Sequence, residues 1–419
     1  MPDGTPIRRL PPELLAEVFE RTVPTSSSSW LTNIREVPWI LGHVSSSWRK
    51  LALSLPSLWS SIYIDEYRKR TVPMLKLALA RSGTAPLTLH LYLSFMGADQ
   101  MMELYSILSN ECYRWKSISI TLESYSNEAA QQFFSLIVPA DYPILESFSF
   151  IMDAPFSHLG VFPAGFFDRA PMLHDIHMFP SLTNDIPWSQ ITTFISSTIT
   201  VEQQFVLLRE APQLQTLEVE DYRGTHVLSV ENSYPLVHAS LTTFRAPDIS
   251  TFSSLTLPAL TNLYINNIVD KNDADKFSAF VSRSGCPLES LRFPFAAFSL
   301  SLVDTFSSLP TLRELNTAFF DGDVTPLLSA LSAPPLILPI LEDLELNQAF
   351  GTLNLRMVVA LASYRHEHTP LRYLTMESKK ILPKRLQAQL PHLTALRELQ
   401  GRDFVLNILE SGKDVLNRR

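Results

Sequence analysis

The 419-residue sequence is poor in cysteine, glycine and charge. Two cysteines are too few for a disulfide framework and are typical of a reducing compartment, so we expect the cytoplasm or the nucleus. Charged residues make up only 18% of the chain and hydrophobic residues 46%, which predicts large folded cores and not disorder. No apolar run reaches the roughly 18 residues of a membrane-spanning helix, so we expect no membrane partner.

Motifs for catalysis and for nucleic-acid binding are missing as well. The net charge of −8 disfavours a basic surface for nucleic acid. No Gly-rich phosphate loop and no Gly-x-Ser-x-Gly turn occurs. His366 and His368 are too closely spaced for a zinc helix, and we expect them in a surface turn. Residues 270–275 lack the glycine of a calcium loop and are expected to begin a helix. We therefore expect no enzyme activity, no metal and no cofactor.

The N-terminal sixty residues contain two apolar helical segments. The first has its apolar residues on one helical stripe behind two prolines: Pro11, Pro12, Leu14, Leu15, Val18 and Phe19. A Ser-rich connector over 23–37 is expected to be a loop. Residues 38–55 repeat apolar side chains every three to four positions and predict one second helix, which Pro56 ends.

Together these residues resemble an F-box, the module that binds a Skp-type adaptor of cullin–RING ubiquitin ligases. The pattern reads Leu-Pro-x-Glu-Leu-Leu-x-x-Val-Phe from Leu10, Val-Ser-x-x-Trp-Arg-x-Leu-Ala from Val44, and then Leu58-Trp59. Ser45–Ser47 stands where many F-boxes have a cysteine and a charged residue. The long connector and the Leu-Pro-Ser-Leu-Trp ending are similar to F-box families of mushroom-forming fungi. The resemblance covers residues 7–64.

The resemblance implies a three-helix F-box domain over 1–66, with a Skp-type adaptor and, through it, a cullin as partners. The adaptor contacts that it implies are Leu10, Pro11, Leu14, Leu15, Val18, Ile40, Leu41, Val44 and Trp48. Some of these residues must build the core of the module instead. We expect Phe19 and Trp48 in the core, and Leu10, Pro11 and Leu14 at the contact.

From about residue 85 onward the pattern Leu-x-x-Leu-x-Leu recurs, often after a proline. Clear copies begin at Leu145, Leu173, Leu214, Leu260, Leu288, Leu312, Leu341 and Leu371. Weaker copies begin at Trp115, Ile191, Leu241 and Leu396, and residues 87–93 predict a first strand by their period of two. The spacing of roughly 20–30 residues is typical of leucine-rich repeats.

Amphipathic segments between these copies predict helices at Ala129–Val138, Val201–Glu210, Ala274–Ser282, Leu302–Leu309 and Met357–Tyr364. We expect an α/β solenoid over 111–405, with parallel strands on the concave face and helices on the convex face. Residues 67–110 would supply a linker helix and a first strand, and 406–419 a C-terminal tail. The alternative, a doubly wound α/β domain, predicts Gly-rich strand ends, and the chain has only 12 glycines.

Side chains between the leucines of each copy should point away from the core and form a candidate target-binding face. The candidate residues are Asp175, His177, Glu218, Glu220, Arg245, Tyr264, Asn266, Arg292, Glu314, Asp343, Glu345 and Glu377. Their excess of acid predicts a target protein with a basic patch. These charges could instead serve solubility alone.

The sequence therefore favours the substrate-recognition subunit of a Skp–cullin–F-box ubiquitin ligase. Its F-box would bind the adaptor, and its repeats would bind a target protein. The alternative is a ligase-independent protein-binding scaffold with a diverged F-box.

Overall fold

The computed structural model describes residues 10–23, 31, 33–93, 96–122, 140–152, 165–178, 186–222, 235–268, 270–321, 323–352, 354–380, 390–401 and 404–416. The expected helix Ala129–Val138 and most of the connector 23–37 lie outside these ranges. The chain forms two compact units, Met1–Ser196 and Ser197–Arg419. Both are α/β, with mostly parallel strands that alternate with helices.

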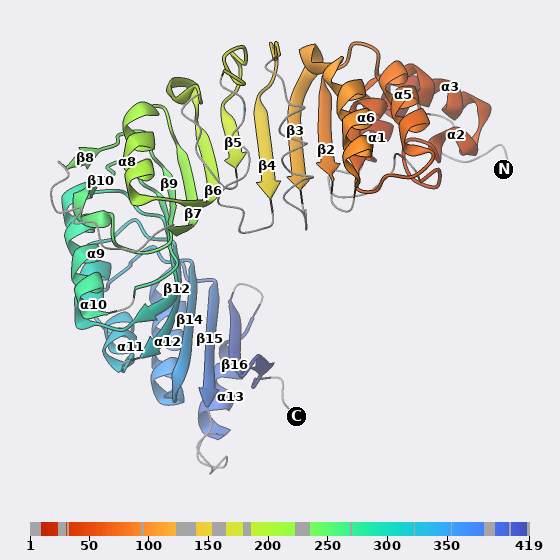
Figure 1. Cartoon of the computed structure of the whole chain (residues 1–419). Helices are drawn as coiled ribbons and strands as arrows, with labels where there is room; N and C mark the ends of the chain where they lie inside the picture. Colours follow the sequence, from red (N-terminus) through yellow and green to blue (C-terminus); the bar gives the residue numbers. More distant parts are fainter. Residues whose placement is uncertain are drawn as a thin grey trace. The chain divides into compact units, whose positions relative to one another are not determined.

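The first unit begins with short helices and continues into a parallel sheet (Figure 1). Its helices are α1 (Pro12–Arg21), α2 (Leu41–Val44), α3 (Ser46–Ser54), α4 (Ser57–Ser60), α5 (Thr71–Ser82) and α6 (Ala98–Ser109). Its strands are β1 (Ser61–Ile64), β2 (Leu87–Tyr92), β3 (Trp115–Leu122), β4 (Ser147–Met152), β5 (Asp175–Met178) and β6 (Thr193–Ile199), which runs into the second unit. Neighbouring strands pair in chain order, and all are parallel.

In its described residues the N-terminal module has four short helices, α1 to α4, where three were expected. The single helix predicted over 38–55 is wrong, because the chain is extended at Ser45, with φ −159° and ψ 167°. The Ser45 side chain accepts a hydrogen bond from the Trp48 amide at 3.2 Å and thereby caps α3. Residues 61–64, expected within the module, form β1 and pair with β2.

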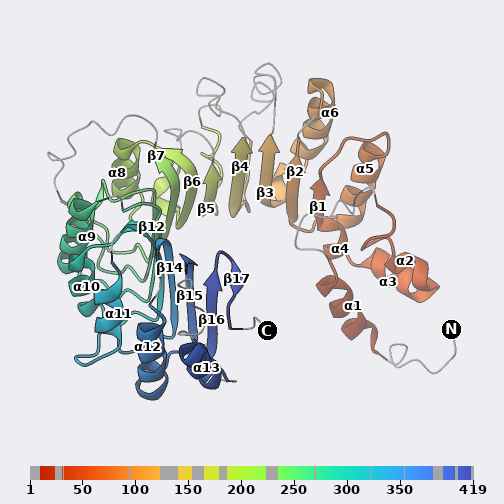
Figure 2. The same cartoon turned by 90° about the horizontal axis from the view of Figure 1, so that it is seen from below.

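The second unit repeats strand and helix along its length (Figures 1 and 2). Its helices are α8 (Val201–Glu210), α9 (Lys271–Ser284), α10 (Leu300–Ser307), α11 (Thr325–Leu331), α12 (Leu355–His368) and α13 (Leu390–Leu399). The strands of its main sheet are β7 (Thr216–Tyr222), β9 (Thr243–Ala246), β11 (Asn262–Ile265), β12 (Ser290–Ala297), β13 (Glu314–Asp321), β14 (Asp343–Thr352), β15 (Tyr373–Lys380), β16 (Val405–Glu410) and β17 (Lys413–Asp414). A separate parallel pair joins β8 (Leu236–Val237) and β10 (Leu255–Thr256).

Strand order in this sheet follows the chain without reversal, and only β17 is antiparallel. A doubly wound domain needs a reversal of strand order, so that alternative is wrong. Figures 1 and 2 show α9 to α12 on one side of the sheet. The four expected helices in described residues are present, and α8 matches its expected bounds of Val201–Glu210.

A proline turn precedes many of the strands. In six of the copies a residue, a proline, a third residue and the first leucine form a turn, as in Ala211-Pro212-Gln213-Leu214. The amide of the leucine donates to the carbonyl three residues earlier, at 3.1–3.3 Å, in the turns that end at Leu145, Leu173, Leu214, Leu260, Leu312 and Leu341. Proline suits the second position of such a turn because its φ is already fixed. The strand then starts two residues after the leucine.

The leucines of successive copies stack into one continuous core. In the second unit the strand register aligns Leu217, Phe244, Leu263, Leu291, Leu315, Leu344, Leu374 and Leu406. None of these side chains is more than 2% exposed. Each repeat therefore buries its apolar row only against its two neighbours, so no repeat has a closed core of its own.

Three sequence-based expectations fail near the C-terminus. Leu396 starts no strand, because it is buried within α13 and the next strand begins at Val405. Residues 406–416 are not a tail, since β16 and β17 continue the sheet and bury Leu406 and Ile408. His366 and His368 lie in the last turn of α12 and not in a surface turn. Asp270 is the N-cap of α9, as expected.

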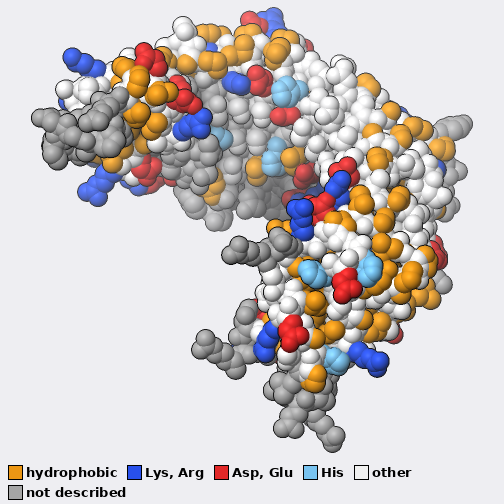
Figure 3. All heavy atoms as spheres, turned by 180° about the vertical axis from the view of Figure 1, so that it is seen from behind, with side chains coloured by type: hydrophobic (Ala, Val, Ile, Leu, Met, Phe, Trp, Pro, Cys, Tyr) orange, Lys and Arg blue, Asp and Glu red, His pale blue; other side chains and the backbone are white. Residues whose placement is uncertain are grey.

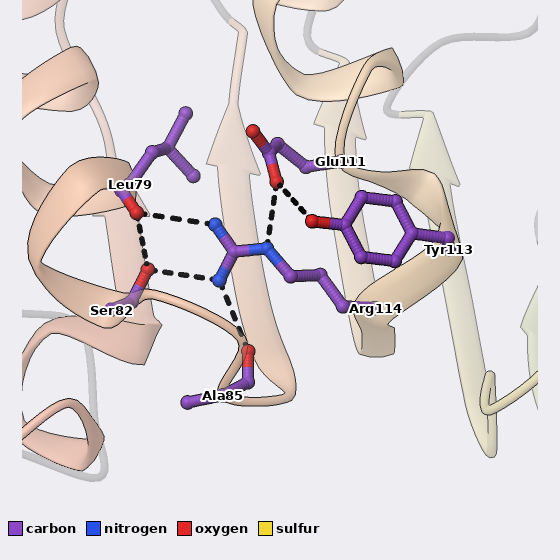
Figure 4. Close-up of polar contacts among 6 residues, drawn as sticks. All are labelled: Leu79, Ser82, Ala85, Glu111, Tyr113 and Arg114. Carbon is purple, nitrogen blue, oxygen red and sulfur yellow. Dashed lines mark hydrogen bonds and ion pairs between the residues drawn. The ribbon is translucent and has the colours of Figure 1, made fainter.

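Arginine side chains join one repeat to the next. Arg114, which precedes β3 and is 3% exposed, donates to the carbonyls of Leu79 and Ala85 and to the Ser82 hydroxyl at the end of α5 (Figure 4). The Glu111 carboxylate forms an ion pair with Arg114, with 2.7 Å between Glu111 Oε2 and Arg114 Nε. Arg365 of α12 is fully buried and likewise donates to the carbonyls of Leu331 and Ile337, which lie before β14. Arg283 of α9 is exposed overall but donates to the Leu255 carbonyl, which lies before β11. These bonds satisfy carbonyls that leave a helix or turn without a backbone partner.

Candidate protein-binding surfaces

The N-terminal module keeps part of its apolar stripe exposed. Pro11 and Pro12 begin α1 where a missing N–H leaves no bond unmade, and the helix then buries Leu15 and Phe19. The phenyl ring of Phe19 meets the Trp48 ring edge-on at 4.8 Å between centroids, which holds α1 against α3. The expectation that Phe19 belongs to the core is confirmed, and Trp48 is half-buried beside it.

The nine residues implied as adaptor contacts divide by exposure. Leu15 and Leu41 are 8% and 6% exposed and belong to the core of the module. The exposed apolar members are Leu10, Pro11, Leu14, Val18, Ile40 and Val44. Leu14, at 49%, has the largest exposed fraction among the leucines of this set. Figure 3 shows apolar side chains gathered with charged ones at the N-terminal end of the first unit. The exposed six are called the N-terminal apolar surface below.

Arg81 of α5 ties this module to the rest of the first unit. Its guanidinium carbon lies 4.3 Å from the Trp59 ring centroid and 5.1 Å from that of Trp39. Burial lowers the pKa of Arg81. The Trp59 indole N–H donates to the Ala52 carbonyl at 2.9 Å, so the Leu-Trp ending of the module is fixed from both sides. The helices α1 to α3 lie at one end of the unit (Figure 1).

The candidate target-binding residues all lie on the strand face that the leucines do not occupy. None of the twelve is buried, while the intervening apolar residues, such as Leu217 and Val219, are fully buried. Asp175 and His177 lie on β5 in the first unit, and the other ten lie on or directly after β7 to β15 in the second. The strand register of those ten is therefore the expected one.

Strand register brings four of these residues into one row across neighbouring strands. Glu218 of β7 stands opposite Arg245 of β9, which stands opposite Tyr264 of β11, which in turn stands opposite Arg292 of β12. The Arg245 guanidinium carbon lies 4.6 Å from the Tyr264 ring centroid. An Arg292 Nη atom lies 3.6 Å from Glu314 Oε2 of β13, and the Ser290 hydroxyl donates to the same carboxylate at 3.0 Å.

These side chains line a hollow of about 340 Å³ on the strand face of the second unit. Thr243, Asn262 and Ser290 complete its polar lining. Figure 3 shows basic and acidic side chains side by side on this face. Sequence reasoning missed Thr243, Asn262 and Ser290, although each lies two residues after the first leucine of its copy, the same position that had suggested Glu314. We call this site the arginine hollow.

Beyond the hollow the strand face is acidic. Asp343 and Glu345 of β14 lie beside Glu314, with Asp343 directly opposite Glu314 in register. Burial and the neighbouring Glu314 and Glu345 carboxylates raise the pKa of Asp343, which Arg292 partly offsets. Asn316, also missed, donates to Glu345 Oε2 at 2.5 Å and orients that carboxylate. The surface thus changes from mixed charge on β9–β12 to acid on β13–β15.

No protein-family model matches the sequence, and a search of curated proteins finds no match. Within the described ranges, no helix is both long and apolar enough to cross a membrane. The same ranges contain no group of three or more His, Cys, Asp or Glu side chains placed to hold a metal ion.

Proposed function

We propose that this chain is the substrate-recognition subunit of a Skp–cullin–F-box ubiquitin ligase. Its N-terminal F-box would bind a Skp-type adaptor in the cytoplasm or nucleus. Its remaining strands and helices would form a degenerate leucine-rich-repeat solenoid whose strand face binds a target protein. Chemistry would belong to the ubiquitin-conjugating partner, and this chain would raise the local concentration of target lysines.

The observation that carries this proposal is the exposed N-terminal apolar surface. Leu14, Val18 and Val44 are each more than 40% exposed. The same module buries Leu15, Leu41 and Phe19, so its own core does not account for the exposed apolar residues. Exposed apolar side chains favour a partner that covers them, because covering removes apolar area from water. Six of the nine residues at which an F-box would meet its adaptor are exposed.

The test is co-expression of the full chain with a Skp-type adaptor, followed by size-exclusion chromatography. Leu14→Asp combined with Val18→Asp should weaken the complex at least about a hundredfold, because each carboxylate would be buried without a partner. Leu15 is unsuitable for this test, since it is buried and its replacement by Asp would damage the fold.

Leu77→Asp is the matched control, because Leu77 is an exposed leucine of α5 outside the N-terminal apolar surface. It should leave the complex intact. Adaptor binding that survives the Leu14 and Val18 double substitution contradicts the docking proposal. A wild-type chain that binds no adaptor would favour the ligase-independent scaffold, for which the departure at Ser45–Ser47 is the supporting feature.

A further inference from the structure

Arg245 occupies the arginine hollow without an anionic partner. Its Nε atom is buried and has no hydrogen-bond partner among the described residues. Although Glu218 stands opposite in register, no ion pair joins the two within the part of the chain that the structure describes. The guanidinium instead stacks on Tyr264. A buried N–H donor without a partner is unfavourable by about 1–3 kcal/mol. The two Nη groups are not buried in this way and make no hydrogen bond among the described residues, so they are the donors that a ligand in the hollow can reach.

The contact with Tyr264 leaves the Nη groups of Arg245 available. The guanidinium carbon lies over the tyrosine ring, and a pair of guanidinium N–H donors can match the two oxygens of a carboxylate or phosphate. The cation–π contact also holds the side chain in place, so less side-chain freedom remains to be lost on binding. Arg292, on the other side of Tyr264, supplies a second positive charge that Glu314 at 3.6 Å partly neutralises.

We propose that the arginine hollow binds a single oxyanion, a carboxylate or a phosphate, on a side chain of the target protein. This inference rests on the proposed function, in which the strand face binds that target. Arg245 is the principal contact and Arg292 the second. Glu218 and Glu314 disfavour a polyanion, because they return the net charge of the four ionised groups to zero.

The acidic surface on β13–β15 adds a second requirement. Glu314, Asp343 and Glu345 favour basic groups, so the anion should lie in an otherwise basic segment. The basic target expected from composition is therefore refined to a segment with one acidic or phosphorylated residue beside basic ones.

The experiment titrates the full chain with three capped amino acids by isothermal calorimetry at low ionic strength. The probes are N-acetyl-glutamate amide, N-acetyl-phosphoserine amide and the neutral N-acetyl-glutamine amide. Saturable binding of the glutamate probe but not of the glutamine probe identifies a carboxylate site, and preference for phosphoserine identifies a phosphate site. Equal binding of all three, or no saturable binding of either anion, overturns the proposal.

Variants assign the binding to the hollow. Arg245→Gln should weaken the preferred anion about ten- to hundredfold, which is the effect of losing a charge-assisted hydrogen bond. Glu218→Gln should tighten binding by up to about fivefold, because a repelling carboxylate is removed. Arg313→Gln is the control, since Arg313 pairs with Glu342 outside the hollow, and it should change nothing. Unchanged binding in Arg245→Gln contradicts the inference.

Two further measurements separate failure of this inference from other failures. If Arg245→Gln does not fold, Arg245→Lys and Glu218→Gln test whether the anion binds in the hollow. Arg245→Lys keeps the charge but loses the planar fork, so it should still weaken binding. Adaptor binding is measured with the same proteins. A chain that binds the anion but no adaptor retains the hollow and refutes the ligase proposal. A chain that binds the adaptor but no anion supports the ligase proposal and refutes the anion site in the arginine hollow.

Discussion

Arg365→Met tests whether buried arginines hold the repeats together. Arg365 of α12 is fully buried and donates from Nε to the Leu331 carbonyl at 2.8 Å, from Nη2 to Ile337 at 2.7 Å and from Nη1 to Leu338 at 2.9 Å. Leu338 has a left-handed φ of 50°, a conformation that a non-glycine residue holds only when its surroundings enforce it. Methionine keeps the apolar stem and removes all three donors.

The expected loss is the difference between two opposing contributions. Hydrogen bonds from a charged donor contribute about 1.5–3 kcal/mol each, so three of them give roughly 5–9 kcal/mol. Burial lowers the pKa of Arg365 to about 10, which corresponds to roughly 3 kcal/mol against keeping the charge inside. Arg365→Met should therefore lower the free energy of unfolding by roughly 2–6 kcal/mol.

The assay is urea unfolding of the full chain combined with amide hydrogen exchange over residues 331–341. Exchange gives a local value, which matters because an array of repeats need not unfold in one step. Arg356→Met is the matched control, since Arg356 is an exposed arginine of the same helix, and its effect should stay within about 0.5 kcal/mol. Equal urea midpoints and equal exchange for the two variants would refute the reasoning.

Two smaller predictions follow from buried groups in the second unit. Thr317 of β13 is fully buried, its hydroxyl has no hydrogen-bond partner among the described residues, and its register neighbours are Phe293 and Leu346. Thr317→Val should raise the free energy of unfolding by about 1 kcal/mol, and a lower urea midpoint would argue against this. Burial raises the pKa of the Cys286 thiol from 9.0 to about 11, so alkylation of the native protein should be slow at pH 8 and rise about a hundredfold by pH 10. Because the unfolded thiol ionises first, stability should fall as the pH rises from 9 towards 11, and alkylation at pH 8 as fast as that of a free thiol would contradict the burial.

The repeat architecture was predictable because its determinants are local. Each Leu-x-x-Leu-x-Leu copy specifies a strand by alternation, and the proline before it specifies the turn, as at Pro212 and Leu214. Positions after the leucines could then be assigned to the outer face without knowledge of any neighbour. The Leu396 copy shows the limit, because in α13 the same spacing also fits a helix.

Other features depend on competing local interactions or on residues distant in sequence, and they could not be predicted in this way. The break at Ser45 depends on a serine cap that competes with an apolar helical period, and periodicity alone does not weigh the two. Nothing in the sequence around Arg114 distinguishes it from a surface arginine, because its partner, the Leu79 carbonyl, comes from α5. In the N-terminal module, Leu14 and Leu15 belong to one apolar stripe, and only packing separates the exposed leucine from the buried one.

The arginine hollow shows why composition alone predicts this strand face poorly. The chain is acidic overall, and most of the candidate residues are acidic, which suggested a basic target. In a parallel sheet, however, a ligand meets a row of side chains taken from neighbouring strands and not a stretch of sequence. Register places Arg245 and Arg292 on the two sides of Tyr264 and leaves Arg245 without an ion-pair partner in the described chain. A site with two arginines is thus built, in an acidic chain, from one residue per repeat. Exchanging Arg245 for the residue of another repeat should change the charge of this face without changing the fold, because the buried leucine row, and not the exposed row, holds the repeats in place.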